Sequence, residues 1–78
     1  MTNEEKKLLQ IGKKLKELRI ARGYINYEHF AYEIGISRSQ YGNYENGANM
    51  KLTTLFKILT FLKVPIEEFF QGINENQI

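Results

Sequence analysis

A donor-rich segment in the middle of the chain carries the side chains best suited to recognising a polar ligand. In the major groove of a duplex, the guanidinium of Arg38 can form two parallel hydrogen bonds to guanine, and the carboxamide of Asn43 can form two to adenine. Ser39 lies four residues before Asn43, so both would share one helix face. Because Gly42 has no side chain, it would leave the helix backbone between Ser39 and Asn43 open to a ligand. We therefore expect base edges to be read by this set: Arg38, Ser39, Gly42 and Asn43.

Each member of this set also has a structural interpretation. Arg38 could be a solvated charge, but a cation in the first turn opposes the helix dipole, which favours a role in binding. Ser39 could equally be ordinary polar surface. A glycine inside a helix costs about 1 kcal/mol relative to alanine. Gly42 would offset that cost either by letting DNA approach the backbone or by relieving a clash between helices.

Local signals around this segment predict the helix that presents it. Gly35 permits the positive φ of a tight turn, and Ser37 is a good N-cap for the helix that follows. Tyr41 and Tyr44 lie three residues apart and would form its apolar back, and Gly47 would stop it. A glycine turn followed by a short, two-faced helix is typical of a helix-turn-helix that binds DNA.

Apolar spacing and helix-ending residues predict an all-α domain with five helices and no strand. Thr2 and Glu5 have the pattern of a capping box, which would start the first helix at about residue 3 or 4. Gly12 lowers the helix propensity there, so we expect the first turns to fray. Pro65 fits the first turn of the last helix, because it lacks the N–H that would be unpaired there. The predicted helices are about 3–22, 27–34, 38–45, 52–62 and 65–71.

Length and composition restrict the possible functions. The 78 residues make one domain with one core. We divide it into an N-terminal extension of the first helix (1–10), a main domain (11–73) and a polar tail (74–78). The absence of cysteine fits a reducing, cytoplasmic location. The longest apolar run is too short and too charged to cross a membrane, so no membrane partner is expected.

The sequence offers no sign of an enzyme, a cofactor or a metal site. His29 is the one histidine, and neither a cysteine nor an acidic cluster accompanies it to complete a metal site. No catalytic pair of carboxylates, nucleophile–base pair or glycine-rich phosphate loop can be recognised. The net charge of +2 permits binding to nucleic acid without requiring it.

Six short segments, in their order and spacing, resemble the phage-repressor-type helix-turn-helix family, also called Cro/C1 or XRE. They are Ile11–Arg19, Phe30–Ala31, Gly35–Ser39, Tyr44–Gly47, Leu55–Ile58 and Val64–Phe70. The resemblance implies a compact, five-helix, lambda-repressor-like domain. It also implies a transcriptional regulator, most simply a repressor, that binds double-stranded DNA sequence-specifically, usually as a homodimer on a palindromic operator.

Two other functions are compatible with the same fold, because a fold alone does not determine function. The first is a protein-interaction module, for example an antitoxin that neutralises a partner protein. The second is a helical bundle that has lost DNA binding. The donor-rich face with Arg38 and Asn43 favours DNA over both.

The resemblance also implies contacts to DNA phosphates, which position a protein without reading sequence. They would come from Ser37, Gln40, Asn46 and Lys51, although Ser37 is equally well explained as a helix cap. Tyr27 stands where the family often has glutamine. Its hydroxyl would donate to a phosphate, or its ring would pack half-buried on the next helix.

Charged residues of the first helix have two predicted roles. By the family resemblance, Arg19 pairs with Glu45 and ties the first helix to the end of the donor-rich helix. The lysines spread over several faces, which is more typical of a solvated helix than of a DNA-binding stripe, although contact with DNA stays open. They are Lys6, Lys7, Lys13, Lys14 and Lys16.

The C-terminal helix offers a surface for a second copy of the chain. Phe69 and Phe70 are adjacent, so one helix cannot turn both into the same core. One would complete the core, and the other, with Ile66 or Ile73, would contact a symmetry mate. The alternative is that both phenylalanines pack within one molecule.

Overall fold

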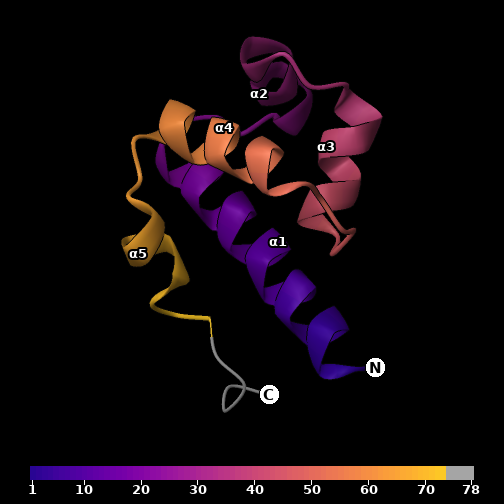
Figure 1. The fold of residues 1–78 in the computed structure, drawn as a ribbon. Helices are drawn as coiled ribbons and strands as arrows, with labels where there is room; N and C mark the ends of the chain where they lie inside the picture. Colours follow the sequence, from indigo (N-terminus) through magenta and orange to yellow (C-terminus); the bar gives the residue numbers. More distant parts are fainter. Residues whose placement is uncertain (74–78) are drawn as a thin grey trace.

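The computed structural model describes residues 1–73, so the predicted tail at 74–78 lies outside the described residues. The described part confirms the all-α prediction, with no strand and these five helices: α1 (Asn3–Ala21), α2 (Tyr27–Ile34), α3 (Arg38–Glu45), α4 (Leu52–Leu62) and α5 (Ile66–Phe70). In Figure 1, α1 runs diagonally through the molecule, α2 and α3 lie at the top and right, and α5 lies at the left. None of these helices is long and apolar enough to span a membrane.

Side-chain caps and glycines set the helix ends close to the predicted positions. Thr2 and Glu5 form the capping box of α1, through hydrogen bonds of 2.8 and 3.0 Å between the side chain of each and the backbone N–H of the other. Ser37 Oγ accepts a hydrogen bond of 3.2 Å from the first turn of α3. Gly35 and Gly47 have φ of 75° and 98°, which favours glycine at both turns.

The last helix differs from the prediction in its start and its length. Pro65 has φ −62° and ψ 146°, so it is the N-cap of α5 and not part of the first turn. The helix then ends at Phe70, before the predicted stop at Gly72. A proline φ suits both helical and extended backbone, so the residue type alone does not decide between them.

Aromatic side chains fix the back of α3 in the core. The ring of Phe30 meets the rings of Tyr41 and Tyr24 edge to face, with centroids 5.2 and 5.1 Å apart, a favoured geometry. Tyr44 is buried on the same side of α3 as Tyr41, which leaves the opposite side of the helix to solvent. The buried apolar residues are Leu15, Phe30, Ala31, Ile34, Tyr41, Tyr44, Leu55, Ile58, Leu59, Leu62, Val64 and Phe69.

A close approach between α1 and α3 lies at Gly12, in the middle of α1. A Cβ atom there would lie 2.5 Å from the backbone oxygens of Tyr44 and Glu45, at the end of α3. A side chain cannot come that close to backbone, so glycine is what lets the two helices cross. α1 is continuous from Asn3 to Ala21, and Gly12 does not interrupt it. A tertiary contact therefore offsets the low helix propensity on which the expected fraying was based.

α5 places its two phenylalanines in different surroundings. Phe69 is fully buried, and the ammonium of Lys14 lies 5.6 Å from the centre of its ring. Phe70 is half-buried and meets Phe69 edge to face. Ile66 is 48% exposed, and Ile73 packs half-buried against the core. Because a fully buried side chain cannot reach a partner molecule, Phe69 is a core residue and is withdrawn from the predicted dimer surface.

We expect Gly12→Ala to lower the free energy of unfolding by about 1–3 kcal/mol, because the added methyl group forces α1 and α3 apart. Gly72→Ala is the control, since a Cβ atom there would make an ordinary 3.4 Å contact with the flexible end of Lys14. Urea unfolding of both variants measures the difference. Equal stability of the two would contradict this explanation of the helix crossing.

Candidate nucleic-acid interface

The solvent-facing side of α3 carries most of the residues predicted to read bases. Arg38, Ser39 and Asn43 are exposed along it, whereas Tyr41 and Tyr44 are buried behind it. The helix has eight residues, and the diameter of an α-helix with its side chains, about 10–12 Å, suits the width of a major groove. Guanidinium, hydroxyl and carboxamide groups are thus presented together on one short helix.

Gly42 is half-buried, and a reason for glycine there lies within the molecule. A Cβ atom would lie 3.1 Å from the ring of Tyr27 at the start of α2. That ring stacks on the ring of Tyr41, with centroids 6.5 Å apart. This tight approach supports the packing interpretation of Gly42, and an approach of DNA to its backbone stays a prediction.

Glu28 on α2 is a neighbour of Arg38 that sequence analysis missed. Nη1 of Arg38 donates to Oε2 of Glu28 over 3.3 Å, and both side chains remain in solvent. The two residues lie on different helices, so no helical spacing could have revealed the pair. An exposed pair contributes about 0–1 kcal/mol, so the contact biases the position of the guanidinium without locking it.

A buried ion pair ties α1 to the end of α3. Nε of Arg19 donates to Oε2 of Glu45 over 2.7 Å, and Nη2 donates to Oε1 over 3.2 Å, which makes the contact bidentate. Nη1 also donates to the backbone oxygens of Tyr24 and Ile25 over 2.6 and 2.7 Å. One guanidinium therefore fixes α1, the loop before α2 and the C-terminal end of α3.

This ion pair also sets the charge of its surroundings. The hydrogen bond to Glu45 raises the pKa of Arg19, although burial acts in the opposite direction. Burial raises the pKa of the nearby Tyr41 hydroxyl, and the Glu45 carboxylate raises it further. At neutral pH the guanidinium is therefore positive and the phenol uncharged, so the negative charge of Glu45 is balanced by Arg19.

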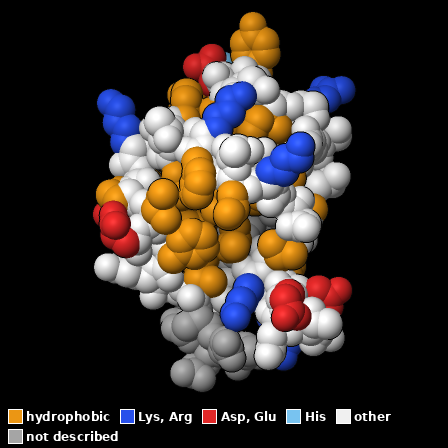
Figure 2. All heavy atoms as spheres, in the orientation of Figure 1, with side chains coloured by type: hydrophobic (Ala, Val, Ile, Leu, Met, Phe, Trp, Pro, Cys, Tyr) orange, Lys and Arg blue, Asp and Glu red, His pale blue; other side chains and the backbone are white. Residues whose placement is uncertain are grey.

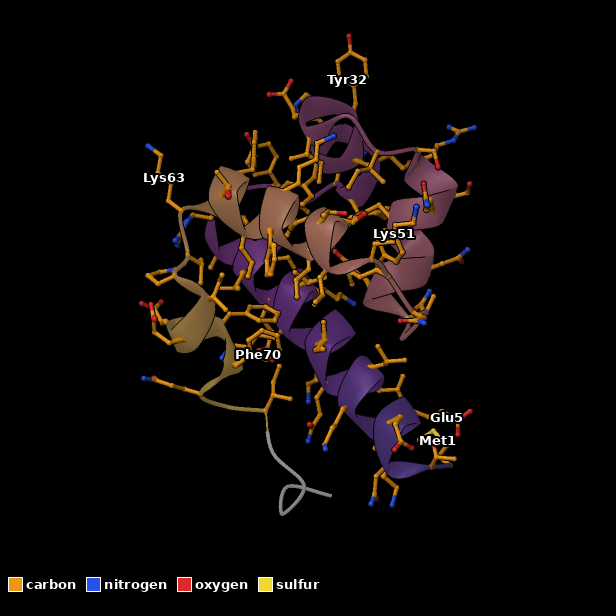
Figure 3. The ribbon with its side chains drawn as sticks, viewed as in Figure 1. Met1, Glu5, Tyr32, Lys51, Lys63 and Phe70 are labelled. Carbon is orange, nitrogen blue, oxygen red and sulfur yellow. The ribbon has the colours of Figure 1, made fainter. Side chains whose placement is uncertain are left out.

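Two grooves flank α3, and they are lined by most of the residues that are predicted to contact phosphates. Gln40 and Lys51 line the first, the α3–α4 groove of about 480 Å³, and Figure 3 shows Lys51 beside α3. Tyr27 and Asn46 line the second, the α1–α3 groove of about 410 Å³. Ser37 lies at the start of α3, where its oxygen is the helix cap and its O–H remains a donor. The second groove is also lined by Lys13, Lys16, Arg19, Gly42 and Glu45.

The described residues contain no group of three or more His, Cys, Asp or Glu side chains that could hold a metal ion. The ring of His29 instead stacks on the ring of Tyr24, with centroids 6.0 Å apart. The contacts available to this surface are therefore hydrogen bonds and charge interactions of the side chains named above.

Comparisons with known proteins match most of the chain. The family described as "Helix-turn-helix domain" matches residues 12–75, a range that includes α2, α3 and both grooves. The control protein C.MunI of Mycoplasma sp is 35% identical over 68 residues, which cover 86% of this chain and 92% of that protein. No solved structure matches the chain.

We expect Glu45→Gln to lower the free energy of unfolding by about 3 kcal/mol, because it leaves the buried charge of Arg19 without its counter-charge. Glu28→Gln makes the same chemical change in the exposed pair with Arg38 and should cost less than about 1 kcal/mol. Urea unfolding of the two variants gives the comparison. Similar losses in both would show that burial does not strengthen the Arg19–Glu45 contact.

Proposed function

The chain belongs to the Cro/C1-type helix-turn-helix family, and we propose that it represses transcription by binding a palindromic operator sequence-specifically as a homodimer. Membership of this family makes it a DNA-binding transcription regulator and not a member of an enzyme family. Three parts of the proposal go beyond family membership: binding to a specific DNA sequence, repression as the regulatory effect, and the homodimer.

One observation carries the proposal, namely the division of α3 into a buried aromatic side and an exposed donor-rich side. With Tyr41 and Tyr44 in the core, α3 can enter a major groove without losing its packing. Arg38 would then pair with a guanine and Asn43 with an adenine, each contact giving about 1–3 kcal/mol of discrimination. Ser39 would add a hydrogen bond that tolerates several bases.

Groups on both sides of α3 would hold the duplex in register. Gln40 and Lys51, which line the α3–α4 groove, would face one strand of the backbone, and Tyr27 and Asn46, which line the α1–α3 groove, would face the other. The O–H of Ser37 adds a donor at the start of α3. Such contacts carry affinity and orientation, while α3 carries the selection of sequence.

Occupancy of the operator is the simplest physical route to repression. A domain whose helix fills the major groove excludes any other protein that needs the same base pairs. We place this activity in the cytoplasm, which the absence of cysteine supports.

An apolar surface on α4 and α5 supports the homodimer. Leu52 and Phe56 of α4 are 65% and 40% exposed, and with Ile66, Phe70 and Ile73 of the predicted surface we take them as the α4–α5 surface. Figure 2 shows hydrophobic side chains gathered over the middle of the face on which α4 lies. A second copy suits this α4–α5 surface, because one recognition helix covers too few base pairs to select a genomic site. Two-fold pairing would hold two α3 helices about one DNA turn apart.

Selection of duplexes from a random pool, followed by binding assays, tests the choice of sequence. We expect Arg38→Ala to cost about 1–3 kcal/mol on the selected duplex and to relax discrimination at one base pair per half-site. Lys51→Ala removes the same charge but should weaken binding evenly across sequences and reduce the salt slope by about one.

Identical behaviour of these two variants on every duplex would show that Arg38 reads no base. Failure of the unmodified chain to enrich any sequence would refute sequence-specific binding altogether. A promoter that overlaps the selected site should lose transcription as the protein is added, and a gain would reverse the proposed sign of regulation.

We expect Ile66→Lys to convert the dimer into a monomer, because it places a charge in the α4–α5 surface. Tyr32→Lys is the matched control, since Tyr32 is 81% exposed on α2 and lies far from that surface (Figure 3). Sedimentation with and without operator DNA measures the outcome. An unmodified chain that is monomeric in both conditions, one molecule to a site, would rule the dimer out.

A further inference from the structure

The α1–α3 groove contains two lysines that the proposed contacts leave unused. Lys13 and Lys16 line it from α1, and both are exposed. They lie three residues apart, so both project from the same side of the helix. Sequence analysis, which treated all the lysines of the first helix as one set, did not separate this pair from the others.

The groove is positively charged, because the acid in it is neutralised. Glu45 is the only carboxylate among the residues that line it, and Arg19 binds that carboxylate through two hydrogen bonds. The two side chains are 9% and 4% exposed, so they present little charge to solvent. Within residues 1–73, neither Lys13 nor Lys16 forms an ion pair. The ammonium groups of Lys13 and Lys16 therefore lie at this groove outside any ion pair, and the nearest acid beside Lys13 on α1 is Glu17, which lines the neighbouring groove.

Lys14 lies between these two lysines in sequence but has a different role. Its ammonium donates to the backbone oxygen of Glu68 over 3.4 Å and lies 5.6 Å from the ring centre of Phe69. Lys14 therefore holds α5 against α1, on a different side from the groove. Lys13 also lines a neighbouring groove beside Lys14 and Glu17, whereas Lys16 lines the α1–α3 groove.

The groove lies directly beside the exposed side of α3. Gly42 lines it from α3, Asn46 from the C-cap of α3, and Tyr27 from the start of α2. Asn43, a predicted base-reading residue, follows Gly42 and lies three residues before Asn46 on α3. A duplex that receives α3 in its major groove would bring one strand of its backbone past this groove.

We propose that Lys13 and Lys16 bind phosphate groups of the DNA backbone in the α1–α3 groove, on the strand that passes the C-terminal half of α3. The inference rests on the proposed function, since it requires a duplex held by α3. Each ammonium acts as a point charge on a phosphate and releases the counterions condensed there. An unpaired Glu45 would repel the same phosphates, so the ion pair with Arg19 also makes the groove suitable for an anion.

The test measures duplex affinity over a range of salt concentrations for Lys13→Gln, Lys16→Gln and the double variant. Each lysine removed should reduce the slope of log affinity against log salt by about one. The loss should be equal on the selected and on a random duplex, because phosphates carry no sequence information. Glutamine preserves helix propensity, and matching circular dichroism spectra establish that the variants fold.

Lys63→Gln is the matched control for total charge. Lys63 is at the C-terminal end of α4, on the opposite side of the molecule from α3 in Figure 3. Its replacement removes one positive charge and should leave the salt slope unchanged.

Three results would overturn the inference in distinguishable ways. A double variant with the unmodified salt slope would refute the phosphate contacts and leave the proposed function standing. A slope reduced equally by Lys63→Gln would assign the effect to net charge and not to the groove. An unmodified chain that binds no duplex at low salt would overturn both the inference and the proposed function.

Discussion

The contact between α1 and the end of α3 is the constraint on which the geometry of the candidate DNA-binding surface depends. Gly12 lets the two backbones approach, and the Arg19–Glu45 pair fixes how they meet. Desolvation offsets much of the attraction in a buried ion pair, so its main contribution here is geometric. The planar guanidinium donates two parallel hydrogen bonds in a rigid fork, which fixes the plane in which the carboxylate lies. A rotation about this contact would move Arg38, at the far end of α3, more than Asn43, so the contact sets how the proposed base-reading residues are presented.

The same contact also separates the surfaces that the proposed function needs. Binding of Glu45 by Arg19 neutralises the one carboxylate of the α1–α3 groove, where Lys13 and Lys16 are proposed to meet phosphates. The exposed side of α3 is proposed for base edges, and the apolar α4–α5 surface for a second copy. In Figure 1, α3 and α5 lie at opposite sides of the molecule, so a second protein molecule bound at α5 would leave the exposed side of α3 free.

Sequence analysis predicted the helices well because their ends depend on local chemistry. Ser37 as a cap and Gly35 as a left-handed turn act within a few residues, and both are recognisable from residue type. The predicted bounds of the fifth helix were less accurate, because the φ of Pro65 is compatible with two backbone conformations. The all-α fold and the exposed and buried sides of α3 could therefore be predicted from the sequence alone.

The remaining features depend on which helices meet, and sequence spacing does not contain that information. The close approach at Gly12 and the pair between Glu28 and Arg38 join different helices. The contacts of Lys14 with α5 and the place of Lys16 in the α1–α3 groove likewise depend on the positions of α3 and α5 around α1. The Arg19–Glu45 pair was expected, but only from family resemblance and not from its spacing. Contacts with DNA itself stay predictions.

Site-specific cross-linking tests the central claim, that the exposed side of α3 lies against base edges. The chain has no cysteine, so Ser39→Cys provides the only thiol at nearly unchanged size. We predict that it forms a disulfide with a thiol tethered to a base in the major groove of the selected duplex. Tyr32→Cys and Ile66→Cys should not. Cross-linking from Tyr32→Cys or Ile66→Cys, with none from Ser39→Cys, would contradict the account.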